Sequence, residues 1–93
     1  MPRKPAWADL DDSARQVYVQ LEETGRMLVV GIDRMRTVGD LRRCLARRLS
    51  VHVDDFWLYY RGCLRNHHTL RDIGITEGSA IELFSTRSGI LGA

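Results

Sequence analysis

Hydrophobic and polar residues alternate near the start of the chain. Val17, Val19 and Leu21 are separated by glutamine and tyrosine, which is the period of a half-buried strand. The stretch "EETGR" then predicts a tight turn in which Gly25 takes a positive φ angle, and a second apolar run follows over residues 27–32. The pattern predicts an antiparallel hairpin.

The hydrophobic period changes in "RTVGDLRRCLARRLS". Between positions 38 and 49 the apolar residues recur every three or four positions, which is one face of a helix. Thr37 stands where an N-cap is expected, and Asp40 follows three residues later as the acidic member of a capping box. We expect a helix over about residues 38–49.

A third strand is predicted in "FWLYYRG", which ends at a glycine. Phe56, Leu58 and Tyr60 alternate with Trp57 and Tyr59. Successive side chains of a strand point to opposite faces, so the two sets lie on opposite sides of the sheet. If the first set packs into the core, the second set lies on the open face.

The last elements are short. We expect a brief strand pairing at residues 63–64, one helical turn at 70–73 and a final alternating strand in "AIELFS". The order is strand, strand, helix, strand, short strand and strand. It predicts an α+β domain in which one helix covers one face of a small sheet.

Length and composition favour a binding module over an enzyme. The chain has 93 residues and is 44% hydrophobic, enough for one core but too small to enclose a substrate cavity comfortably. We expect a flexible leader or short docked helix at 1–14, the domain at 15–86 and a flexible tail at 87–93. Neither a membrane span nor a secretion signal is predicted, because the apolar runs are short. The expected location is cytoplasmic or nuclear.

The basic residues are almost all arginine. Lys4 is the only lysine among the 14 basic residues, and the net charge is +2. The skew reflects either codon composition or a use for planar, bidentate donors. Six arginines on or just before the predicted helix form a candidate basic surface: Arg34, Arg36, Arg42, Arg43, Arg47 and Arg48. This surface has two interpretations, a nucleic-acid site that neutralises phosphates or a solvated helix face.

The segment "CLRNHH" contains metal-ligand residue types. Adjacent His67 and His68 cannot easily both turn to one ion with Cys63, and no Cys-x-x-Cys spacing accompanies them. A nucleophile pair of Cys63 and His67 would need a lowered thiol pKa and a cleft. We therefore predict no metal, no cofactor and no catalytic residue here, and we interpret Cys44 and Cys63 as free thiols.

The order and spacing of these segments resemble ubiquitin and the ubiquitin-like β-grasp domains over residues 16–89. The resemblance is carried by "QVYV" with its Thr-Gly turn, "TVGDLRRCL", "DDFWLYYRGCL", "TLRDIGITEGSAIELF" and "TRSG". It implies a mixed sheet of four to five strands, with the first and last strands parallel and central. It also implies a core, made of Val17, Val19, Leu28, Val30, Val38, Leu41, Leu45, Leu49, Phe56, Leu58, Leu64, Leu70, Ile73, Ile75, Ile81 and Leu83.

The resemblance places the family's partner-binding patch at Tyr59, Glu82 and Phe84. Aromatic residues and an acid stand there in place of a small aliphatic residue and a histidine, so standard ubiquitin receptors are not expected to fit. Conjugating members end in Gly-Gly, whereas here Gly89 is followed by Ile90. Conjugation through the tail is therefore not expected.

We predict a non-enzymatic protein–protein interaction module that docks through its open sheet face. The predicted anchors are Trp57, Tyr59 and Phe84, because aromatic residues gathered on one open face usually meet a partner. The other predicted partner-binding residues are Tyr18, Arg61 and Glu82. Two other interpretations of the face stay open: the leader folds back over it, or the aromatic residues are scattered.

Other functions remain as alternatives. The chain is a processed modifier if a protease exposes Gly89 or Gly92, or an Arg-rich nucleic-acid-binding module if the basic surface holds phosphates. It is also open to interpretation as a fragment of a larger polyprotein. The sequence leaves the partner and the oligomeric state open.

Overall fold

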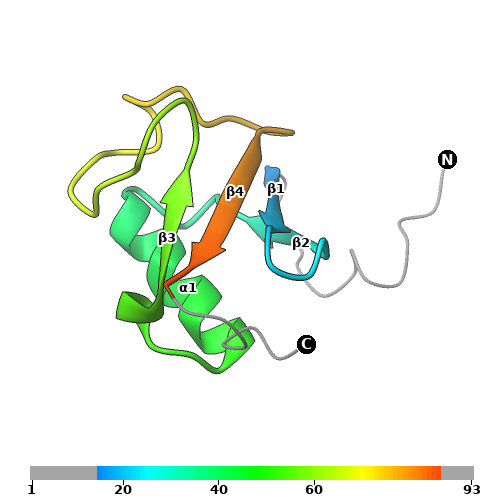
Figure 1. Cartoon of the computed structure of the whole chain (residues 1–93). Helices are drawn as coiled ribbons and strands as arrows, with labels where there is room; N and C mark the ends of the chain where they lie inside the picture. Colours follow the sequence, from blue (N-terminus) through cyan, green and yellow to red (C-terminus); the bar gives the residue numbers. More distant parts are fainter. Residues whose placement is uncertain (1–14, 87–93) are drawn as a thin grey trace, which may run out of the picture.

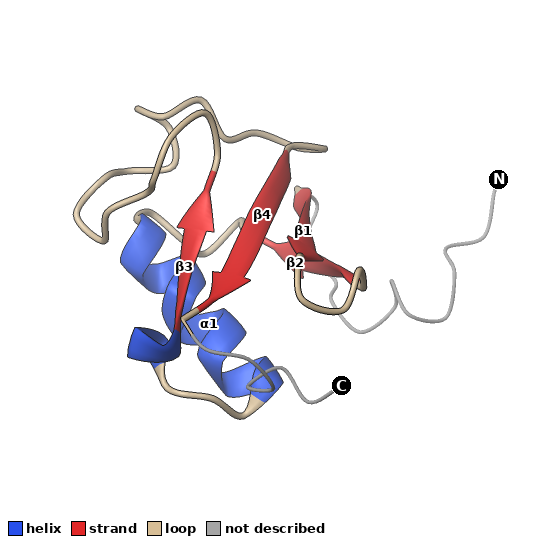
Figure 2. Ribbon diagram, in the orientation of Figure 1, coloured by secondary structure: helices blue, strands red, loops and turns tan. Residues whose placement is uncertain are grey.

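The computed structural model describes residues 15–86, which form one sheet covered by one helix (Figure 1). The sheet has four strands in the order β2-β1-β4-β3. Figure 2 shows α1 lying along one side of this sheet. The elements are β1 (Gln16–Leu21), β2 (Met27–Gly31), α1 (Val38–Leu49), a 3₁₀ helix η2 (Val53–Asp55), β3 (Phe56–Tyr59) and β4 (Ala80–Ser85).

The first two strands form the predicted hairpin. β1 and β2 pair antiparallel, with Val19 opposite Leu28. Gly25 has a φ of 76°, which a residue with a side chain rarely adopts. The N–H groups of Gly25 and Leu21 close the turn by donating to Leu21 O and Arg26 O, each at 2.7 Å. The glycine therefore sets where the chain reverses.

The two central strands are β1 and β4, which run parallel. Val19 pairs with Ile81, and on the other side of β4 Leu58 pairs antiparallel with Leu83. The α+β class and the mixed sheet expected from the sequence are thus confirmed. A parallel pair needs a long connection between its strands, and here α1 and β3 lie within that connection.

The short strand expected at residues 63–64 does not form a fifth strand. Tyr59 and Cys63 make one isolated bridge, and Leu64 N–H donates to Leu58 O at 2.9 Å. Arg61 and Gly62 have φ angles of 59° and 144°, so the chain turns sharply after β3. Only a single bridge follows this turn before the chain leaves the sheet. The sequence also did not predict η2, which directly precedes β3.

The helix begins at the predicted capping box. Thr37 Oγ1 accepts a hydrogen bond from Asp40 N–H at 3.2 Å, and the Asp40 carboxylate accepts from the N–H groups of Arg36 at 3.0 Å and Thr37 at 3.1 Å. These backbone donors hold the pKa of Asp40 below its ordinary value. Their contribution to stability is present above the ordinary aspartate pKa and is lost as pH falls through the lowered value.

The loop that contains the two histidines completes this helix start. Val38 N–H donates to His68 O at 2.9 Å, and Gly39 N–H donates to Asn66 O at 3.1 Å. These N–H groups have no partner within the helix. A Cβ atom at position 39 would lie 3.3 Å from Asn66 O, so glycine lets the loop approach closely. The loop therefore has a structural role that its side chains did not reveal.

The hydrophobic core lies between the sheet and α1. Most of the expected core residues are buried, but Leu28, Leu49 and Ile73 are only half-buried. Each of them stands at the periphery, in the edge strand, at the end of the helix and in a loop respectively. The buried core residues are Val17, Val19, Leu21, Val30, Ile32, Val38, Leu41, Leu45, Ala46, Phe56, Leu58, Leu64, Leu70, Ile75, Ile81 and Leu83.

Replacing Thr37 with alanine is expected to lower the free energy of unfolding by about 1 kcal/mol, because the helix loses its N-cap acceptor. Urea denaturation followed by circular dichroism measures the change. Thr76→Ala is the matched control, since Thr76 is exposed and its hydrogen bonds use only backbone atoms: its N–H donates to Ser79 Oγ and its carbonyl accepts from Ser79 N–H. Equal unfolding midpoints for the two variants would show that the cap contributes nothing.

Candidate functional site: an aromatic sheet face

Three aromatic side chains gather on the side of the sheet that faces away from α1. We call Trp57, Tyr59 and Phe84 the aromatic face. On β3, Trp57 is the register partner of Phe84, and Tyr59 is the register partner of Glu82. Glu82 and Phe84 are two residues apart on β4. The Trp57 and Phe84 rings stack with their centroids 5.6 Å apart and their planes 15° apart. The Tyr59 ring meets the Phe84 ring edge-on, with a centroid distance of 6.4 Å.

The aromatic face is exposed although its rings touch. Trp57 is 37% exposed and Tyr59 is 42% exposed, while Phe84 is half-buried between them. Phe56 and Leu58, which alternate with them, are buried in the core. Stacked and edge-on rings hold one another in place, at about 0.5–1.5 kcal/mol for each pair. The result is an ordered apolar surface open to solvent.

Tyr18 shares this side of the sheet but lies apart from the aromatic face. Its partner on β4 is Ala80, and within residues 15–86 its ring contacts no other aromatic ring. Met27, on β2 opposite Gln20, is 51% exposed, but Gln20 and Glu82 lie between it and Tyr59. Met27 was not among the residues predicted from the sequence to bind a partner. The signal was its alternation with Leu28 along a strand whose register was not yet known.

An acidic pair lies beside the aromatic face. Glu82 is on β4 between Gln20 and Tyr59, and Glu22 follows the end of β1. A hydrogen bond to the Glu82 side chain, with smaller effects of desolvation and charge repulsion, raises the pKa of Glu22 above its ordinary value. Glu22 was missed because its distance from Glu82 depends on the parallel pairing of β1 with β4.

Replacing Glu82 with glutamine is expected to lower the pKa of Glu22 toward its ordinary value, because an amide accepts a weaker hydrogen bond from the protonated Glu22 than a carboxylate does, and because the neighbouring charge is removed. Carboxyl NMR titration of both proteins measures it. In the wild type, protons are favoured on the folded chain, so this pair's contribution to stability is greatest below the ordinary glutamate pKa and is lost as pH rises through the raised value. An unchanged Glu22 titration would contradict the pairing.

Arg61 follows the aromatic face in the chain but its guanidinium lies elsewhere. The group stands over the ring of Tyr60, 5.4 Å from its centre. Tyr60 is half-buried and packs against the core rather than joining Trp57 and Tyr59. A rim contact by Arg61 therefore requires the guanidinium to leave the Tyr60 ring.

The candidate basic surface is divided by the structure. Arg42 donates from Nη2 to Val53 O and, at 2.8 Å, to Phe56 O, and its guanidinium lies 5.6 Å from the centre of the Phe56 ring. Arg48 donates to Val29 O at 2.6 Å. Two of the six arginines are thus directed at backbone carbonyls.

The other four arginines are exposed. Arg43 pairs with Asp40, and the Arg36 backbone is tied to the same carboxylate. The side chains of Arg34 and Arg47 form no hydrogen bond or ion pair with any residue in the range 15–86. Of these four, Arg43 is the one whose guanidinium pairs with a carboxylate within residues 15–86.

The histidine loop does not assemble a metal site in the part of the chain that the structure describes. No three His, Cys, Asp or Glu side chains within residues 15–86 come together as ligands for one ion. The rings of His67 and His68 lie 4.5 Å apart, and His68 Nδ1 accepts from Arg65 N–H at 3.4 Å. Neither Cys44 nor Cys63 forms a disulfide within the described residues. None of the helices in this range is long and apolar enough to cross a membrane.

The leader and the tail glycines, Gly89 and Gly92, lie outside the described residues, so the geometry does not bear on tail processing. In a comparison with known families, residues 17–88 match the model of the Ubiquitin family. No curated protein matches the chain.

Proposed function

The chain belongs to the ubiquitin family, and from this premise we propose that it is a non-enzymatic module that binds a partner protein through its aromatic face. The single observation that carries the proposal is the ordered, solvent-exposed cluster of Trp57, Tyr59 and Phe84. Aromatic side chains of this kind contribute strongly to binding when a partner removes water from them.

The acidic pair indicates what kind of partner segment fits. Glu82 is the register partner of Tyr59. Glu22 lies close enough to Glu82 for the Glu82 side chain to raise the pKa of Glu22. A lysine or arginine of the partner would relieve the repulsion between the two carboxylates. We therefore propose a partner segment with an apolar side chain for the aromatic face and a basic side chain for the acidic pair.

The positions of the arginines favour this function over nucleic-acid binding. The guanidinium groups of Arg42 and Arg48 are directed at backbone carbonyls, and Arg42 is only partly exposed. The aromatic face, which would be needed to stack on bases, lies on the side of the sheet that carries the acidic pair. A phosphate backbone near Glu22 and Glu82 would be repelled.

A capture experiment tests the proposed function. The full chain is immobilised as wild type, as the double variant Trp57→Ser/Tyr59→Ser and as the control Arg26→Ser, which changes an exposed residue of the hairpin turn. Circular dichroism first confirms that all three fold. We expect a protein that is retained by the wild type and the control but lost from the double variant. Retention of the same proteins by all three would exclude the aromatic face.

A further inference from the structure

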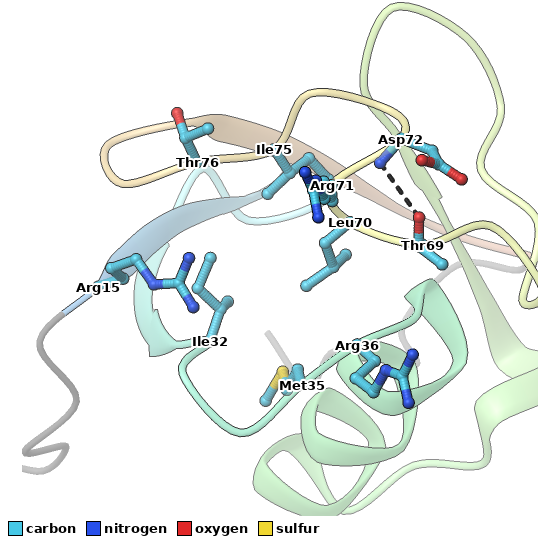
Figure 3. Close-up of a pocket in the computed structure, with 10 residues that line it drawn as sticks. All are labelled: Arg15, Ile32, Met35, Arg36, Thr69, Leu70, Arg71, Asp72, Ile75 and Thr76. Atoms are coloured by element: carbon cyan, nitrogen blue, oxygen red, sulfur yellow. Dashed lines mark hydrogen bonds between the residues drawn. The ribbon is translucent and has the colours of Figure 1, made fainter.

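A groove with three arginines lies apart from the aromatic face. It measures about 660 Å³ and lies between the start of β1, the segment before α1 and the loop before β4 (Figure 3). We call it the arginine groove. Its lining residues are Arg15, Ile32, Met35, Arg36, Leu70 and Arg71, with Thr69, Asp72, Ile75 and Thr76 completing the wall.

The floor of the groove is apolar and firmly held. Ile32, Leu70 and Ile75 are 3%, 4% and 4% exposed and belong to the hydrophobic core. Leu70 N–H donates to Arg36 O at 2.8 Å, and Ile75 N–H donates to Leu70 O at 2.9 Å. The first bond joins the loop before β4 to the segment before α1, and the second lies within that loop. The groove is therefore preformed rather than opened by movement.

The charge at the groove is positive. Arg15 Nε pairs with Asp33 Oδ1 at 2.9 Å, which leaves its terminal N–H groups directed toward the floor in Figure 3. The side chains of Arg36 and Arg71 form no ion pair or hydrogen bond with any residue between 15 and 86. Asp72 is the one acidic residue of the lining, and Figure 3 shows its carboxylate turned away from the floor.

We propose that the arginine groove binds an acidic peptide segment of a partner protein, with an aliphatic side chain on the floor and carboxylates on the arginines. Guanidinium groups pair with carboxylates through two parallel hydrogen bonds. The volume is in the range of sites that hold a few side chains. Nucleic acid fits less well, because the lining has no aromatic ring on which a base could stack.

This second site is independent of the proposed function. None of the residues of the aromatic face or the acidic pair lines the arginine groove. The groove takes a segment of the opposite charge to the one proposed for the aromatic face.

Fluorescence anisotropy with the full chain tests the groove. The probe is a fluorescein-labelled Asp-Asp-Leu-Asp-Asp peptide at low salt. Replacing Arg71 with glutamine is expected to weaken binding about tenfold, as is Arg36→Gln, because each loses a charge-assisted hydrogen bond. Arg26→Gln removes the same charge from an exposed residue outside the groove and is expected to leave binding unchanged. Equal losses for Arg26→Gln and Arg71→Gln would overturn the proposal.

Two altered peptides and one altered chain test its details. Asn-Asn-Leu-Asn-Asn is expected not to bind, and Asp-Asp-Ser-Asp-Asp is expected to bind more weakly than the leucine peptide. If serine binds as well as leucine, the apolar floor is not used and the proposal fails. Changing Asp9, Asp11 and Asp12 to asparagine in the full chain is expected to leave affinity unchanged; a clear gain would make the chain's own leader the occupant, and the external partner would be excluded.

Two further measurements separate this site from the other possibilities. Tyr59→Ala is expected to leave peptide binding unchanged. The proposal for the arginine groove and the proposal for the aromatic face are therefore tested separately, and either one can be refuted without the other. Loss of peptide binding in Tyr59→Ala would show that the peptide binds the aromatic face, and the proposal for the arginine groove would be wrong. A single-stranded oligonucleotide that bound more tightly than the peptide, and was lost in Arg71→Gln, would replace the acidic peptide as the ligand.

Discussion

Replacing Arg42 with alanine is expected to lower the free energy of unfolding by about 3 kcal/mol, the largest change among the surface arginines. The side chain joins α1 to the segment that leads into β3, through hydrogen bonds to Val53 O and Phe56 O. It also donates to Asn66 Oδ1 at 2.8 Å. Each carbonyl that loses a charged donor in a partly buried place costs about 1–3 kcal/mol.

The matched control for this change is Arg47→Ala. Arg47 is on the same helix, is exposed and has no hydrogen bond or ion pair within residues 15–86, so we expect a loss below about 0.5 kcal/mol. Urea denaturation of both variants provides the comparison. Arg42→Met keeps much of the packing on Phe56 but none of the hydrogen bonds, and it should fall between the two. Identical midpoints for Arg42→Ala and Arg47→Ala would mean that Arg42 is only a solvated charge.

Replacing Tyr59 with alanine is expected to weaken partner binding by about 2 kcal/mol, or roughly thirtyfold, without unfolding the domain. Tyr59 is 42% exposed and meets Phe84 edge-on, so it contributes more to the surface than to the core. Its loss should reduce the free energy of unfolding by less than about 1 kcal/mol. Titration calorimetry with the captured partner measures the affinity, and urea denaturation measures the stability.

Tyr18→Ala is the matched control for Tyr59. Both are exposed tyrosines on the same side of the sheet, but Tyr18 faces Ala80 and stands outside the ring contacts. We expect a smaller loss of affinity for Tyr18→Ala. Equal affinity of the partner for the wild type and Tyr59→Ala would refute the anchor role of Tyr59, even if the partner still distinguished the wild type from other variants.

Part of the candidate site could be predicted because it depends on one strand. The alternation of Phe56 and Leu58 with Trp57 and Tyr59 is local, and the strand geometry turns it directly into two faces. Met27 and Glu22 could not be found in this way. Their relevance depends on which residues of other strands stand beside them, and a shift of one residue in register reverses the face of every side chain.

The partners of the arginines on α1 also could not be predicted from the sequence. Arg42, Arg43 and Arg47 are alike in the sequence, and the helical pattern places them all near the surface. Whether a guanidinium meets a backbone carbonyl, a carboxylate or water depends on what packs against that part of α1. Val53 and Phe56 are more than ten residues away from Arg42 in the chain. The arginine groove likewise combines three separate segments.

The sequence by itself determined the hairpin with its turn at Gly25, the helix that begins after Thr37, and the identity of the aromatic strand. These follow from interactions between residues close together in the chain, namely hydrogen bonds, turn geometry and hydrophobic period. Only the tertiary structure decided that the sheet has four strands rather than five, which partners Arg42 has and that Glu22 pairs with Glu82. Those depend on contacts between distant segments, and no local pattern encodes which distant segments will meet.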